Sequence, residues 1–172
     1  MKSVVAAAAG FLALALAGPA SAALTVGAAA PEFTAPGAEA GKAATVDLAA
    51  LLKQGPVVLY FFPSAFTDPA GSREFADNVE KFRAAGASVI GMSRDGVETL
   101  ARYSVEVCAG KFIVASAAEA LVNAYDVNDG AMFNTRTTYV IDRLGTIAFV
   151  HDDDDHRDHV KRSLAFVEAM AR

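Results

Sequence analysis

Cys108 is the only cysteine in this chain of 172 residues, so the sequence offers one sulfur nucleophile and cannot form an internal disulfide. The residue lies near the end of a helix predicted over residues 96–107. A half-buried cysteine in such a place is most often a small apolar residue. It becomes reactive only where a positive neighbour or an exposed site favours the thiolate. Any thiol chemistry of this protein must therefore pass through Cys108.

A second group of chemically versatile side chains fills nine consecutive positions, 151–159, which hold all three histidines and five acidic residues. His156 and His159 are three apart and would share a helix face, with Asp155 as the helix cap. Together with His151 they form a ligand set that suits zinc, manganese or nickel. A charge run at a strand-to-helix turn is more often a solvated loop. We therefore expect no metal and no other cofactor, and keep a metal site as an alternative.

The first 22 residues have the pattern of a secretory signal peptide. Lys2 precedes the apolar block Val4 to Ala17, and the triplet Ala20-Ser21-Ala22 forms an A-x-A cleavage site. Cleavage after Ala22 would leave one domain over residues 23–172. The apolar block is too short to span a bilayer, and no lipid-attachment cysteine follows it. The sequence thus predicts a periplasmic or secreted protein with no membrane attachment after cleavage.

The charge balance of the mature chain restricts its partners. Fourteen basic and twenty acidic residues leave a net charge of about −6. No basic stripe is present that could hold phosphates, so nucleic acid is not an expected partner. The 150 residues after the predicted cleavage site suffice for one domain with a buried core and give no reason to expect a second.

Predicted strands and helices alternate along the mature chain. The strongest strand is Val57 to Phe62, six apolar residues of the kind that is buried on both faces of a sheet. The segment 23–36 is predicted to be irregular or a hairpin, and 37–42 to be a turn. This order gives a mixed sheet with helices on both faces. The other predicted elements are helices over 48–53, 69–85, 96–107 and 117–125, a last helix with Val160, Leu164 and Val167 on one face, and strands over 44–46, 87–92, 112–115, 138–141 and 147–150.

Helix starts and faces can also be predicted from residue types. Asp47 is expected to cap the helix 48–53 and Asp95 the helix 96–107, with Val105 on the buried face of the latter helix. Asp68 and Pro69 are expected to be the N-cap and the first residue of the preceding helix, because aspartate and proline favour those two positions.

Four local motifs occur together in this chain. They are Val26 to Phe33, Val57 to Pro63, Pro63 to Thr67, and Arg136 to Asp142 followed by Gly145. As a set they resemble the peroxiredoxins of the alkyl hydroperoxide reductase and thiol-specific antioxidant type, over nearly all of residues 26–170. The resemblance implies a thioredoxin-like, three-layer α/β/α sandwich with a mixed central sheet. It also implies that Pro63, Thr67 and Arg136 belong to a site that orients peroxide and stabilises an anion.

The reactive cysteine of that family is missing. Counting forward from Thr67 places its position on Ala70, whereas counting backward from Phe75 places it on Asp68, so the loop is two residues shorter. The shortening favours natural divergence over an engineered replacement. Neither residue can attack the O–O bond of a peroxide, which needs an oxidisable sulfur atom. Asp68 is either an ordinary helix cap or also a replacement for the thiolate charge beside Arg136; without the resemblance, Arg136 would be read as a surface cation.

Three functions are compatible with these residues. The leading hypothesis is an exported peroxiredoxin-like protein that has lost peroxidase turnover and uses its fold for binding. In the first alternative, Cys108 works as an active thiol with an external reductant, since some peroxiredoxins keep a resolving cysteine in this region. The second alternative is a periplasmic metal-holding protein that uses residues 151–159. The expected partners are a periplasmic thiol protein or another protein, and a second copy of the chain in a homodimer.

Overall fold

The computed structural model describes residues 23–130 and 132–172, so the predicted signal peptide lies outside the described residues. No helix in this part of the chain is long and apolar enough to cross a bilayer. The strands are β1 (Thr34–Glu39), β2 (Lys42–Asp47), β3 (Val57–Phe61), β4 (Ser88–Ser93), β5 (Ile113–Ser116), β6 (Thr137–Ile141) and β7 (Ile147–Asp152). The helices are α1 (Leu48–Leu52), α2 (Ala70–Ala84), α3 (Val97–Glu106), α4 (Glu119–Ala124), the 3-10 helix η1 (His156–Asp158) and α5 (His159–Met170).

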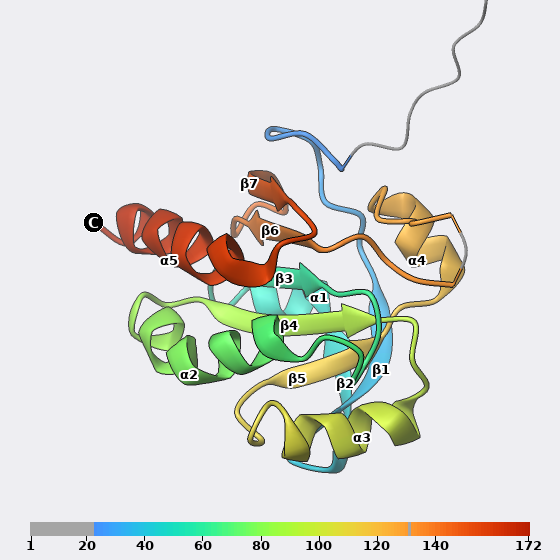
Figure 1. The fold of residues 1–172 in the computed structure, drawn as a ribbon. Coiled ribbons are helices and arrows are strands. Elements are labelled where there is room, and N and C mark those ends of the chain that lie inside the picture. Colours follow the sequence, from blue (N-terminus) through green and yellow to red (C-terminus); the bar gives the residue numbers. More distant parts are fainter. Residues whose placement is uncertain (1–22, 131) are drawn as a thin grey trace, which may run out of the picture.

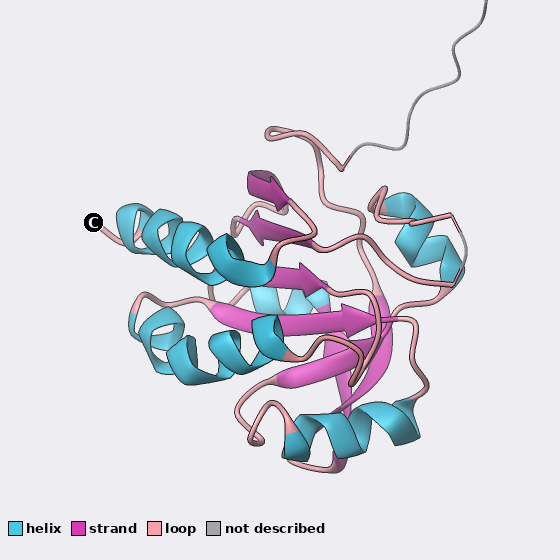
Figure 2. Cartoon of the chain, in the orientation of Figure 1, coloured by secondary structure: helices cyan, strands magenta, loops and turns pink. Residues whose placement is uncertain are grey.

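The strands form one mixed sheet in the order β2-β1-β5-β4-β3-β6-β7 (Figure 2). β3 lies near its centre, parallel to β4 and antiparallel to β6, and all five of its residues are buried. This confirms the central strand predicted from the apolar run.

Helices cover both faces of the sheet (Figure 1). Side chains alternate along β3, so Val58 and Tyr60 pack against α2, α3 and α5, whereas Leu59 and Phe61 lie in the core under α1 and α4. In Figure 1, α2 and α5 run side by side on one face and α1 lies behind the sheet. The predicted three-layer arrangement is therefore confirmed.

Strand register brings three chain segments to one edge of the sheet. Phe61, the last residue of β3, pairs with Thr137, the first residue of β6, and Thr137 also pairs with Asp152, the last residue of β7. The loop after β3, the residue before β6 and the turn after β7 therefore meet at this edge. They carry Pro63 to Asp68, Arg136, and the acidic residues after Asp152.

The predicted turn over residues 37–42 is wrong. These residues belong mostly to the hairpin of β1 and β2, whose turn is only Ala40-Gly41, with φ angles of 49° and 76°. Glycine suggested a turn, but Gly37 lies within β1, where it packs closely against β5. A Cβ on Gly37 would lie 2.8 Å from the Cα of Ala115 on β5. Its missing side chain lets β5 approach β1.

Two predictions for α3 are also wrong. Asp95 does not cap the helix: Gly96 is the N-cap, and the Asp95 carboxylate instead accepts a hydrogen bond from the Ala65 backbone at 2.7 Å. Val105 is 52% exposed. Residues at positions i, i+3 and i+4 stay on one face of a helix, whereas repeated steps of four residues, which lead to Val105, drift away from that face. The buried residues of α3 are Leu100, Tyr103 and Ser104.

Candidate functional site

Arg136 is buried at the sheet edge where the three segments meet, with only 3% of its surface exposed, so it is not a surface cation. Its Nη2 donates a hydrogen bond to the Asp68 carboxylate at 2.8 Å. Its Nη1 donates to the Tyr60 hydroxyl, and its Nε donates to the Asp154 carbonyl at 2.9 Å. Each guanidinium nitrogen thus has a polar partner, which a buried positive charge requires.

Each partner of Arg136 comes from a different element. Tyr60 lies on β3, Asp68 in the loop before α2, and Asp154 in the turn after β7. The backbone N–H of Asp153 also donates to the Arg136 carbonyl at 3.1 Å, so the turn after β7 holds both the backbone and the side chain of Arg136. Burial raises the pKa of Tyr60 to about 12, although Arg136 opposes the shift. Tyr60 is therefore a neutral acceptor for the guanidinium.

Asp68 contacts Arg136 more closely than it contacts the helix. The N-cap of α2 is Pro69, so the predicted cap at Asp68 is wrong by one residue. The Asp68 carboxylate lies 3.4 Å from the backbone N–H of Ala70, a weak contact, and 2.8 Å from Arg136. Asp68 is 48% exposed, so its carboxylate faces solvent on one side and the buried cation on the other. A negative charge here also suits the N-terminal end of α2.

Gly71 lets the first turn of α2 pack directly on this site. A Cβ on Gly71 would overlap the Tyr60 hydroxyl and would lie 3.3 Å from Nη1 of Arg136. Glycine is otherwise unfavourable inside a helix by about 1 kcal/mol relative to alanine. Its role is visible only once the helix is placed against the sheet, so neither Gly71 nor Tyr60 was predicted from the sequence as a residue of the site.

The other residues predicted for the site are not all brought together. Thr67 is exposed, and in the described part of the chain its hydroxyl makes no hydrogen bond with Arg136. Its neighbour Phe66 has φ of 66°, a strained backbone for a bulky residue, and its ring lies edge-on to Tyr103 with centroids 5.1 Å apart. Pro63 follows β3, half-buried. The structure thus joins Arg136 with Asp68 but leaves Thr67 outside their hydrogen-bond network.

Cys108 lies in the core beyond the end of α3. It is fully buried among the apolar side chains that α2 and α3 place against the sheet. Burial raises the pKa of its thiol to about 12, so the thiolate is scarce near neutral pH. This environment disfavours the alternative in which Cys108 is an active nucleophile.

The three histidines of residues 151–159 do not converge on one point. His151 and His159 are buried with their ring centroids 4.5 Å apart, whereas His156 lies on η1. Asp155 caps η1, as predicted, and its carboxylate is also held by Arg157, whose hydrogen bonds lower the pKa of Asp155. Within residues 23–130 and 132–172, no group of three or more histidine, cysteine, aspartate or glutamate side chains is arranged to hold a metal ion. The predicted alternative of a metal site is therefore not supported.

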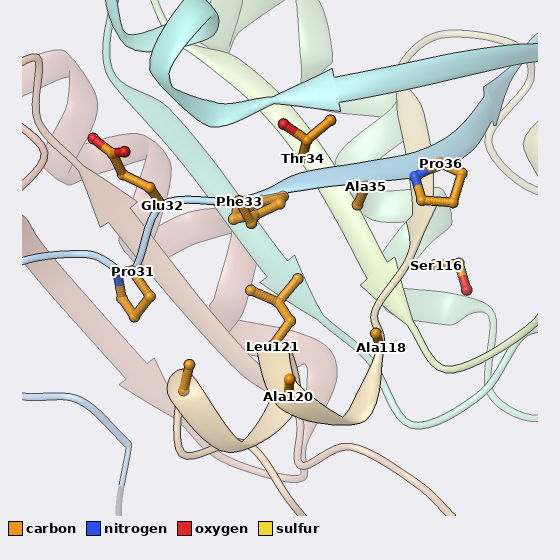
Figure 3. A pocket seen from close by; sticks show the side chains of 11 residues that line it. Pro31, Glu32, Phe33, Thr34, Ala35, Pro36, Ser116, Ala118, Ala120 and Leu121 are labelled. Carbon is orange, nitrogen blue, oxygen red and sulfur yellow. The ribbon is translucent and has the colours of Figure 1, made fainter.

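An apolar groove of about 320 Å³ lies on the other face of the sheet, between residues 31–36 and α4. In Figure 3, Leu121 points from α4 towards Phe33 across this groove. Alanine and proline side chains form most of its remaining wall, and Glu32 is its one charged residue. Tyr60 and Arg136 are not among the residues that line it.

Comparison with known proteins identifies the family. Residues 26–150 match the AhpC/TSA family, so this chain belongs to that peroxiredoxin family. It is 33% identical over 132 residues to the Mycobacterium tuberculosis protein named peroxiredoxin MT1643, covering 72% of this chain and 84% of that protein. It is 28% identical over 124 residues to chloroplastic peroxiredoxin Q of Gentiana triflora, covering 68% of this chain but only 56% of the plant protein.

Solved structures confirm the thioredoxin-like fold. The crystal structure of peroxidoxin BcpB from Mycobacterium tuberculosis has a TM-score of 0.75 and 28% identity, with 84% of this chain and 97% of that chain covered. The mitochondrial 2-Cys peroxiredoxin from Plasmodium falciparum has a TM-score of 0.76 at 22% identity, covering 85% of this chain and 94% of that chain, and shows the fold alone.

Proposed function

We propose that this chain is an exported, periplasmic member of the peroxiredoxin family that has lost peroxidase turnover and keeps its fold as a binding module. The observation that carries the proposal is the ion pair of Asp68 with the buried Arg136 at the start of α2. Reduction of a peroxide requires a nucleophile that can accept oxygen, as a thiolate does when it becomes a sulfenic acid. A carboxylate cannot do this, and the one cysteine is buried elsewhere.

In this proposal, the Asp68 carboxylate is the structural substitute for the family's thiolate. Arg136 and the N-terminal end of α2 create a positive field that needs a negative partner. Asp68 supplies that partner at 2.8 Å, whereas Ala70, the other position indicated by counting, has no charge to offer. The proposed function is thus binding of another protein by the surface of this domain. The expected partner is a periplasmic thiol protein or a second copy of the chain.

Peroxide consumption by the purified mature protein tests the loss of turnover. We expect no consumption above a thiol-free control in stopped-flow measurements, with or without a thiol reductant. Rapid, saturable reduction of hydrogen peroxide that disappears in Cys108→Ser would overturn the proposal. N-terminal sequencing of the exported protein, expected to begin at Ala23, tests the export part.

A matched pair of variants tests the assignment of Asp68. Asp68→Cys and Ala70→Cys, each in a Cys108→Ser background, place a single thiol at the two candidate positions. We expect the thiol at position 68 to have the lower pKa and to react with hydrogen peroxide about tenfold faster at neutral pH, because it faces Arg136 and a thiolate is the attacking species. In that reaction the thiolate sulfur takes one oxygen as sulfenic acid, and the other leaves as water. A faster thiol at position 70 would refute the assignment.

A further inference from the structure

Two of the three histidines are buried together beneath the start of α5. His151, on β7, is 7% exposed, and His159, the first residue of α5, is fully buried. Their ring centroids are 4.5 Å apart. The Thr138 hydroxyl on β6 lies 2.8 Å from Nδ1 of His159. The pair therefore connects α5 with the last two strands of the sheet.

The hydrogen-bond partners assign both imidazoles as neutral. Nη1 of Arg162 lies 2.9 Å from Nδ1 of His151, and a guanidinium only donates, so this Nδ1 is an acceptor. The proton of His151 is then on Nε2, which is buried without a partner among the described residues. Nε2 of His159 lies 2.8 Å from the Asp153 carbonyl, which only accepts, so His159 carries its proton there. Its Nδ1 then accepts from Thr138.

A second proton on either ring would disrupt this arrangement. On Nδ1 of His151 it would point at the Arg162 guanidinium, so a donor would face a donor. On Nδ1 of His159 it would require Thr138 to stop donating. Two charged imidazoles would also repel each other at this separation in a poorly solvated site.

The histidine pair is connected to the Arg136 site by one turn. The Asp153 carbonyl accepts from His159, while the Asp153 N–H donates to the Arg136 carbonyl. The next carbonyl, of Asp154, accepts from Nε of Arg136. Residues 153–155 are thus held by His159 on one side and by Arg136 on the other.

We propose that His151 and His159 form an acid-sensitive latch, whose protonation at mildly acid pH releases the turn 153–155 and the start of α5 from the sheet. Release also removes the Asp154 carbonyl from Arg136, so the latch controls the freedom of the buried guanidinium. The latch acts on the contact of Arg136 with the Asp154 carbonyl, so it does not depend on the function proposed for Asp68.

The charges around the pair favour the neutral, closed state. Burial is the main cause that lowers the pKa of His159 to about 4, and it also lowers the pKa of His151. Arg162 and Arg136 add to these shifts, whereas the nearby carboxylates oppose them. Once released, an imidazole returns to its ordinary pKa near 6.5. The open state therefore binds protons more tightly than the closed state, and its population rises as the pH falls from about 6.5 towards the folded pKa. The groups that face the pair are Arg162, Arg136, Asp152, Asp153, Asp158 and the Tyr60 phenol.

Amide hydrogen exchange measured by NMR at pH 7 and pH 5 tests the latch. The measured exchange rate divided by the intrinsic rate gives the opening constant of each amide. From pH 7 to pH 5, the opening constant of residues 153–164 should rise about twentyfold through protonation of His159 alone, and further if His151 also takes up a proton. The Arg136 Nε–H should lose protection in parallel. Amides of β3 and β4, which exchange by global unfolding, should stay better protected than residues 153–164 at both pH values and serve as the internal reference.

Variants separate the latch from other titrating groups. His151→Asn keeps an acceptor for Arg162, and His159→Gln keeps a donor for the Asp153 carbonyl. The double variant should change its opening constant by less than about twofold between pH 7 and pH 5. His156→Gln removes the third histidine and should retain the full response.

Two results would overturn the proposal. One is an unchanged opening constant of residues 153–164 in the wild-type protein at pH 5. The other is an opening constant of residues 153–164 equal to that of β3 and β4 at both pH values, which would mean that these amides exchange only by global unfolding and that the histidines affect only global stability. Both are read from the wild-type protein, so the test stands even if the double variant does not fold.

Discussion

Asp68→Asn and Arg136→Met, made singly and together, measure how strongly the carboxylate and the buried guanidinium stabilise one another. Asparagine keeps the shape of Asp68 and its capacity to accept from the Ala70 backbone, but it carries no charge. Methionine keeps much of the apolar stem of Arg136 and removes every donor. The interaction energy from this double-mutant cycle therefore reports the ion pair and not the helix start.

The structure sets the size of the expected coupling. The two charged groups are 2.8 Å apart, with 3% of the Arg136 side chain and 48% of the Asp68 side chain exposed. Fully exposed pairs contribute about 0–1 kcal/mol, and breaking a fully buried pair costs about 3–5 kcal/mol. We expect a coupling of about 1–2 kcal/mol at low salt and less in 1 M salt, because solvent reaches the Asp68 side. Arg136→Met should be the more destabilising single change, since Tyr60 and Asp154 also lose a donor.

Urea unfolding at neutral pH, followed by far-UV circular dichroism because the chain has no tryptophan, measures the four free energies. Arg102 and Glu106 provide a control cycle on the surface of α3, where their charged atoms are 3.5 Å apart and both side chains are more than half exposed. That control should couple by less than about 0.5 kcal/mol. A coupling of Asp68 with Arg136 no larger than the control, at low salt, would refute the role of Asp68 as a charge partner.

Three further predictions concern the core and the pH response. Cys108 should not react with a thiol reagent such as DTNB in the folded protein, and should react fully in denaturant, since it is fully buried with a pKa of about 12. Gly71→Ala should destabilise the protein by about 2 kcal/mol in urea titrations through overlap with Tyr60, whereas Gly96→Ala, at the N-cap of α3 with open space around it, should cost less than about 1 kcal/mol. Because the folded pKa of His159 is about 4, its stabilisation is complete above pH 6.5 and should fall by about 2 kcal/mol from pH 7 to pH 5; a flat profile would contradict this.

The sequence by itself determined the central strand, the alternation of strands and helices, and the helix start at Asp47. Each is encoded by residues a few positions apart: the consecutive apolar residues of β3 favour a strand that is buried on both faces, and the Asp47 carboxylate reaches the Ala50 N–H three residues later. The absence of a second cysteine is likewise a property of the sequence alone. The resemblance to peroxiredoxins also indicated Arg136 and Asp68 as neighbours, and the geometry agrees.

Only the tertiary structure decided how the site is built. Arg136 meets Asp68 across 68 residues and Tyr60 across 76, and these segments come together because β3 pairs with β6. Glycine in a helix and aspartate before a helix are locally ambiguous, so Gly71 and Asp95 were missed or misassigned. The histidine run looked like a solvated, acidic turn, yet β7 and α5 bury His151 and His159 against each other. Burial depends on which elements pack together, and a linear pattern of charges does not contain that information.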